Sequence, residues 1–131
     1  DVTWVASALS EEDRDVAEQA GGSFDEVDAA GNPFRLRLVA HAADDYDRFY
    51  NVFANPLLWF LQHELWPLAE RPEIDRSTYI AWDAYRAVNE RFAKAAAEDA
   101  APGATVWIQD YQLQLVPAML RAMRHWEPEP A

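Results

Sequence analysis

Hydrophobic residues follow two different spacings along the chain, and the two spacings alternate. Short apolar runs between turn-forming residues predict β-strands, whereas hydrophobic residues that recur every three or four positions predict helices. The runs predict strands at residues 2–9, 24–27, 34–40 and 104–108. The recurring pattern predicts helices at residues 10–20, 43–54, 56–66 and 77–100 and after residue 110. Because strands and helices alternate, we expect an α/β fold with a Rossmann-like, mainly parallel sheet and flanking helices.

Two of these elements have distinct start and stop signals. Ser10 is followed by Glu11, Glu12 and Asp13, a pattern that favours the start of a helix with acidic residues at its positive end. The pair Gly21-Gly22 is typical of a helix end. In residues 34–40 hydrophobic and polar side chains mostly alternate, which indicates an edge strand or a hairpin.

The dipeptide Asn55-Pro56 interrupts the hydrophobic region between residues 43 and 66. The residue before a proline avoids helical backbone angles, while proline itself is well accepted in the first turn of a helix. We therefore expect Asn55 to cap a second helix that begins at Pro56. On one continuous α-helix, Tyr50 and Trp59 would be rotated by ~900° from each other and would lie on opposite faces. A bend at Asn55-Pro56 would turn both side chains toward one pocket.

The segment from residue 104 to 121 contains the change from strand to helix around which the other elements are arranged. Asp110 lies at that change, directly after the predicted strand. In open α/β sheets ligands bind outside the carboxyl ends of the strands, so Asp110 is a candidate binding residue. An aspartate at the start of a helix is equally well explained as a cap that accepts backbone N–H groups. The residues leave both interpretations open.

The composition indicates one packed domain and argues against several classes of function. Half of the 131 residues are hydrophobic and 13% are aromatic, which is typical of a globular core. A net charge of −12 argues against nucleic acid as a partner, because phosphate binding needs clustered Lys and Arg. The chain has no cysteine and no apolar run long enough to span a membrane. We expect a soluble, cytoplasmic piece of a larger protein, with a domain at residues 1–125 and a tail at 126–131.

The sequence lacks the motifs of several well-known kinds of enzyme and binding site. Neither a glycine-rich dinucleotide loop, nor a phosphate loop, nor the Gly-x-Ser-x-Gly motif of serine hydrolases occurs. His41, His63 and His125 are scattered and lack the spacing of a zinc site. We expect no metal and no cofactor.

Three segments, in this order, resemble the trehalose-6-phosphate synthase family: YNVFANPLLW at 50–59, AWDAYRAVNERFA at 81–93 and VWIQDYQLQLVPAMLR at 106–121. This family consists of retaining glycosyltransferases with two Rossmann-like domains, the GT-B type. The resemblance implies an acceptor-side, N-terminal domain fragment from which the donor-binding C-terminal domain is missing. It implies two partners, a nucleotide-glucose donor and the sugar-phosphate acceptor glucose-6-phosphate, and is compatible with a homo-oligomer. The reaction would be a step of trehalose biosynthesis.

Two other functions fit the same resemblance. The family also includes glucosylglycerol-phosphate synthases and pseudo-glycosyltransferases, which use other acceptors. A non-catalytic binding or regulatory domain with this fold is the second alternative. The glycine-rich nucleotide loop of the family and the histidine that follows its motif helix are not found in this sequence. We therefore expect the 131-residue chain alone to be inactive.

The resemblance assigns acceptor binding to Tyr50 and Asp110, places Trp59 in the wall of the same pocket, and assigns no catalytic residue. A tyrosine hydroxyl can donate to a phosphate oxygen, a carboxylate can accept from sugar hydroxyls, and an indole offers a flat apolar wall. Without the resemblance, core packing would explain Tyr50 and Trp59 as well. Ala54 replaces the usual serine of the family, which bears on the choice of acceptor. Cations for the phosphate would come from segments outside this chain, or from Arg48 if it turns inward.

Overall fold

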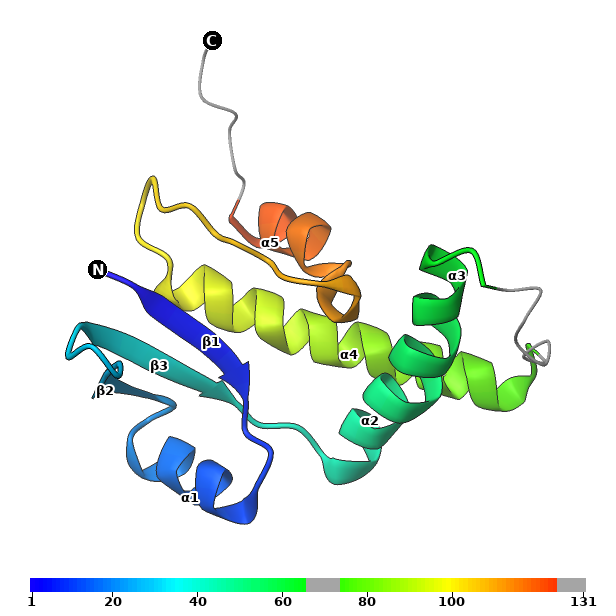
Figure 1. Ribbon diagram of the computed structural model, residues 1–131, viewed down its shortest axis with the longest axis horizontal. Coiled ribbons are helices and arrows are strands. Elements are labelled where there is room, and N and C mark those ends of the chain that lie inside the picture. The colour runs from blue at the N-terminus through cyan, green and yellow to red at the C-terminus, as the bar shows by residue number, and fades with distance from the viewer. Residues whose placement is uncertain (66–73, 125–131) are drawn as a thin grey trace, which may run out of the picture.

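The computed structural model describes residues 1–65 and 74–124 (Figure 1). In chain order its elements are β1 (Thr3–Ser7), α1 (Glu11–Gln19), β2 (Ser23–Val27), β3 (Pro33–Val39), α2 (Ala43–Asp47), the π-helix η1 (Arg48–Trp59), α3 (Phe60–Gln62), α4 (Arg76–Asp99), the 3₁₀ turn η2 (Tyr111–Leu113) and α5 (Val116–Arg124). The α/β class expected from the sequence is confirmed. His125 and the predicted tail at 126–131 lie outside the described residues.

The start of α1 follows the predicted capping pattern. Ser10 Oγ accepts a hydrogen bond from the N–H of Asp13 at 3.0 Å, and the Asp13 carboxylate accepts from the N–H of Ser10 at 3.0 Å. The backbone hydrogen bonds from Ser10 and Leu9 lower the pKa of Asp13 below its ordinary value. At the other end, Gly21 has a positive φ of 67°, so the glycine pair ends the helix as expected.

The sheet is mixed rather than mainly parallel, which corrects the expectation from the sequence. Strand β3 lies in the centre, pairs in parallel with β1 and pairs antiparallel with β2. The turn between β2 and β3 is the cause, since Asp28 Oδ1 accepts the N–H groups of Ala30 and Asn32 at 2.8 Å each. Such a turn reverses the chain at once, so the two strands must run in opposite directions. The hairpin indicated by residues 34–40 is thus confirmed.

Residues 104–108 form an irregular segment outside the sheet, so the prediction of a central buried strand is wrong. A strand needs a neighbour that takes up its backbone hydrogen bonds, and the hydrophobic pattern says nothing about that neighbour. In Figure 1 the segment runs along α4 toward α5. Ile108 packs against the core, whereas Trp107 is 87% exposed. Its apolar residues are therefore only partly buried.

The helix after β3 continues from Ala43 to Gln62, so the break expected at Asn55-Pro56 is absent and no new helix begins at Pro56. Its middle part η1 is instead wound as a π-helix, with Pro56 inside it. In an α-helix the proline ring would press against the carbonyl four residues earlier and would leave one hydrogen bond unmade. The wider π winding pairs residues five apart, so the segment stays helical through the proline. Its buried residues Phe53 and Ala54 come four and five positions after Phe49, which fits this winding.

Helix α4 forms the centre of the core. Its buried side chains include Ala81, Tyr85, Val88, Phe92 and Ala95, which form one stripe along the helix, while Ala96, expected in the same stripe, is half-buried. The helix packs against α2, η1, η2, α5, β1 and β3. Figure 1 shows α4 spanning the molecule between the sheet and α5, with the helical segment after β3 crossing it. Within the described ranges, no helix is both long enough and apolar enough to cross a membrane.

Candidate functional site

Tyr50 lies near the start of η1 and is 37% exposed. Its ring stacks on Tyr46 with 5.9 Å between ring centroids and 8° between the ring planes. Phe49, which is buried in the core, contacts it at a centroid distance of 6.3 Å. The aromatic contacts fix the ring on one side, while the exposure leaves part of the side chain accessible to a ligand.

Trp59 ends η1 and is half-buried. Its ring stacks on His63 with 4.3 Å between centroids and meets Phe60 edge-on at 5.1 Å. A helix with i→i+5 bonds has more than four residues per turn, so nine residues make about two turns. Tyr50 and Trp59 are nine apart and therefore lie on nearly the same side of η1, with Ala54 between them. The π winding thus aligns the two residues along the helix without the break that the sequence suggested, and a pocket common to both stays a prediction.

Asp110 is exposed and has an unusual backbone conformation, with φ 70° and ψ 172°. Apart from glycine, few residues adopt such angles, and the strain costs on the order of 1–3 kcal/mol. One carboxylate oxygen accepts the N–H of Tyr111 at 2.8 Å, where η2 begins. The side chain therefore makes a cap-like hydrogen bond and is also accessible to a ligand. Strained residues of this kind concentrate at functional sites.

Tyr111 connects the Asp110 turn to the helix that carries Tyr50 and Trp59. Its hydroxyl donates to Asn55 Oδ1 at 2.5 Å. Burial raises the pKa of Tyr111 above its ordinary value, and the negative charge of Asp110 raises it further. Asn55 was expected to cap a helix, but it lies within η1 and accepts this hydrogen bond instead. Sequence reasoning assigned no role to Tyr111, although Tyr111 and Asn55 both belong to the segments that resemble the family.

A pocket of about 190 Å³ lies where β1 and β3 end. It is lined by Ala8, Leu9, Arg14, His41, Ala43, Tyr46, Asp47 and Asn51. Tyr50, Trp59 and Asp110 do not line it, although Tyr46 and Asn51 are close to Tyr50 on the same helical segment. The three expected site residues thus lie beside this pocket or on the exposed surface, and their role in binding stays a prediction.

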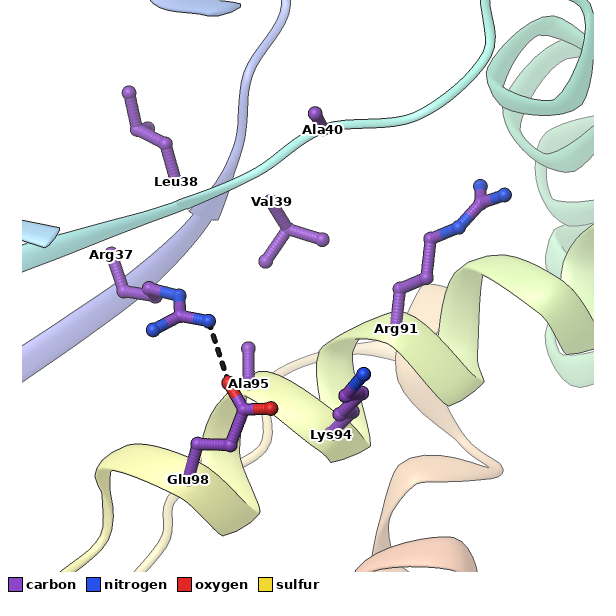
Figure 2. Close-up of a pocket in the computed structure, with 8 residues that line it drawn as sticks. All are labelled: Arg37, Leu38, Val39, Ala40, Arg91, Lys94, Ala95 and Glu98. Atoms are coloured by element: carbon purple, nitrogen blue, oxygen red, sulfur yellow. Dashed lines mark hydrogen bonds and ion pairs between the residues drawn. The ribbon is translucent and has the colours of Figure 1, made fainter. Parts of the chain in front are cut away.

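A second pocket, of about 220 Å³, lies between β3 and α4 and is shown in Figure 2. Arg37, Arg91 and Lys94 bring positive charge to it, and Glu98 adds a carboxylate. Arg37 Nη2 lies 2.7 Å from Glu98, the contact marked by the dashed line. Its other terminal nitrogen lies 3.3 Å from Asp99. Carboxylates already occupy the Arg37 guanidinium, so this pocket is weakly suited to an anion.

Two further sequence expectations concern charge and metals. Arg48 pairs with Asp44 at 3.7 Å across one helical turn, and its side chain is 43% exposed. It therefore does not turn inward to provide a cation. Over residues 1–65 and 74–124, no three His, Asp or Glu side chains are grouped as a metal site would require.

The chain was compared with protein families, curated proteins and solved structures. The profile of the family described as Glycosyltransferase family 20 matches residues 1–126. Trehalose-6-phosphate synthase of Mycolicibacterium smegmatis is 49% identical over 100 residues, which is 76% of this chain and 19% of that protein. The protein of the same name from Mycobacterium avium is 52% identical over 89 residues, 68% of this chain and 17% of that one. This chain thus spans only about a fifth of the length of the first relative.

Solved structures of trehalose-phosphate synthases also align with this chain. An α,α-trehalose-phosphate synthase (UDP-forming) from Burkholderia vietnamiensis aligns with a TM-score of 0.60 and 25% identity. The alignment covers 94% of this chain and 29% of that one. An α,α-trehalose 6-phosphate synthase from Burkholderia multivorans aligns with a TM-score of 0.62, and at 24% identity it shows the fold alone. Since the family profile matches nearly the whole sequence, this chain belongs to glycosyltransferase family 20.

Proposed function

We propose that this chain is part of the acceptor-side, Rossmann-like domain of a retaining GT-B glycosyltransferase. The complete enzyme would transfer glucose from a nucleotide-glucose donor to glucose-6-phosphate and form trehalose-6-phosphate. The family match over residues 1–126 carries this proposal. Relatives that are about half identical and are named trehalose-6-phosphate synthase support it further. The donor-binding part would lie in the portion of those relatives that this chain does not match.

In this proposal, Tyr50, Trp59 and Asp110 bind the acceptor. The tyrosine hydroxyl donates to the phosphate, and the Asp110 carboxylate accepts from sugar hydroxyls. The indole of Trp59 covers one face of the sugar ring. The hydrogen bond from Tyr111 to Asn55 supports this arrangement, because it holds the Asp110 turn close to the helix that carries the other two residues.

Ala54, which stands where the family has a serine, is completely buried in η1. It lies four residues after Tyr50 and five before Trp59, so in this proposal the two acceptor-binding side chains flank it. Glucose-6-phosphate stays the favoured acceptor, and a direct comparison with glycerol-3-phosphate in the full-length enzyme tests that preference.

The substitution Asp110→Asn in the full-length enzyme separates the binding role from the capping role. Asparagine caps helices about as well as aspartate and also tolerates positive φ, so the fold should be preserved. If Asp110 binds acceptor hydroxyls, loss of the charged acceptor should reduce kcat/KM for glucose-6-phosphate on the order of ten- to a hundred-fold. The KM for the nucleotide-glucose donor and the Tm should change little.

Asp75→Asn is the matched control. Asp75 caps α4 by accepting the N–H groups of Ser77 and Thr78 at 2.8 and 3.1 Å. This variant should keep wild-type kinetic constants. Equal activity of the Asp110→Asn variant and the wild-type enzyme would contradict the binding role and leave only the cap.

A further inference from the structure

Two polar side chains of α4 are completely buried in the apolar core. Tyr85 is 1% exposed and Asn89, one helical turn later, is 0% exposed. Buried polar groups are costly unless they form hydrogen bonds, so their partners indicate why they are there. Both residues belong to the segment 81–93, which resembles the family but received no role in the proposed site.

Both side chains have backbone partners that follow Asp110, and Asn89 Nδ2 also donates to the carbonyl of Tyr85 at 2.9 Å. The Tyr85 hydroxyl donates to the carbonyl of Tyr111 at 2.8 Å and accepts from the N–H of Gln114 at 3.3 Å. Asn89 Nδ2 donates to the carbonyl of Gln112 at 3.0 Å, and Asn89 Oδ1 accepts from the N–H of Leu115 at 3.1 Å. Two side chains thus form hydrogen bonds with four backbone groups of the 110–115 turn.

These hydrogen bonds replace those that regular secondary structure would supply. Residues 111–113 form a single 3₁₀ turn, and α5 begins only at Val116. Buried backbone groups in such a connection need partners from elsewhere in the protein. The conformation of the turn is therefore determined by α4 as well as by its own sequence.

We propose that Tyr85 and Asn89 are positioning residues that hold the 110–115 turn so that Asp110 faces the acceptor. A backbone as strained as that of Asp110 persists only where its surroundings fix it. The two α4 side chains fix the turn from the core side, and the hydrogen bond from Tyr111 to Asn55 fixes it from the η1 side. This inference rests on the proposed function, because it assigns Asp110 to the acceptor.

The test is kinetic and uses the full-length enzyme. Tyr85→Phe removes only the hydroxyl. Asn89→Asp keeps the acceptor for Leu115 but removes the donor to the carbonyls of Gln112 and Tyr85. Small displacements of a binding group are costly, so we expect kcat/KM for glucose-6-phosphate to fall about ten-fold or more in each variant. The KM for the nucleotide-glucose donor should stay within about two-fold, because the turn contacts only the acceptor in this proposal.

Val88→Ala is the control for a loss of stability alone. Val88 is completely buried on the same helix between the two positioning residues. This variant should have a lower Tm, while its kinetic constants for both substrates should stay near those of the wild type. If Tyr85→Phe changes the acceptor constants no more than Val88→Ala does, the positioning role is wrong. A wild-type enzyme that transfers no glucose to glucose-6-phosphate would instead contradict the proposed function.

A second measurement does not depend on activity or on whether every variant folds. In the 131-residue chain, hydrogen exchange of the Gln114 and Leu115 amides reports on the turn directly. Tyr85→Phe should speed exchange at Gln114 at least about ten-fold while amides in the middle of α4 keep their wild-type rates. Unchanged exchange at Gln114 would show that the Tyr85 hydroxyl does not hold the turn and would overturn the inference.

Discussion

Acidification is expected to destabilise the fold through the buried His41. Its ring is 6% exposed and lies between Tyr46 and Phe92, with centroid distances of 5.7 Å to each. Nε2 lies 3.2 Å from the hydroxyl of Ser7, and within the described structure the buried Nδ1 has no hydrogen-bond partner. Burial, and then the positive charge of Arg91, lower the pKa of His41 from 6.5 to about 4. His41 is therefore neutral in the folded chain at pH 7.

The sign and size of the effect follow from the two pKa values. Between pH 6.5 and about 4 the unfolded chain binds a proton on His41 that the folded chain does not. The contribution of the neutral histidine to the free energy of unfolding is thus complete above pH 6.5 and is lost as the pH falls toward 4. The free energy of unfolding falls by about 3 kcal/mol in total, and about 2 kcal/mol of this is already lost at pH 5.

Urea unfolding of the 131-residue chain at pH 7 and at pH 5 measures this loss, with His41→Phe as the comparison. Phenylalanine preserves the aromatic packing against Tyr46 and Phe92 but cannot bind a proton. Carboxylates titrate in both proteins, so the difference between them isolates His41. We expect the wild type to lose about 2 kcal/mol more than His41→Phe between the two pH values. Equal losses in wild type and His41→Phe would refute the reasoning.

Two further predictions concern the surface and the activity of the chain. Arg37→Ala should lower the free energy of unfolding by about 1–3 kcal/mol, because it leaves the largely buried carboxylate of Asp99 without its cation. Arg35→Ala should cost less than about 1 kcal/mol, since its partner Asp25 is exposed, and equal losses in urea unfolding would contradict this difference. Incubated with nucleotide-glucose and glucose-6-phosphate, the 131-residue chain alone should release no nucleoside diphosphate, because it spans about a fifth of its relative. Measurable turnover would mean that the donor site lies within these residues.

Local signals predicted the helices better than the sheet. The stripe from Ala81 to Ala95 and the Ser10 capping pattern depend on residues close together in sequence, and both are present in the structure. The pairing of strands depends on partners far away in sequence. For that reason the mixed sheet and the irregular segment at 104–108 could not be derived from the pattern of hydrophobic residues.

The residues of the candidate site stay a prediction, and their geometry could not be derived from the sequence. The position of Asp110 at a change of element follows from the change of hydrophobic spacing. Its positive φ does not, because aspartate rarely adopts it and the hydrogen bonds that support it come from α4. The π winding of η1 was missed because Pro56 is compatible with either a break or a wider helix, and packing decides between them.

The position of β1 at the margin of the sheet affects how this chain behaves at high concentration. Among the described strands β1 pairs only with β3, so its other side presents unpaired backbone groups beside the exposed Val2 and Trp4. Edges of this kind promote aggregation by strand addition between molecules. At neutral pH the net charge of −12 opposes this through mutual repulsion. Near the isoelectric point of about 4.4 the repulsion disappears, so the chain should be concentrated and stored well above that pH.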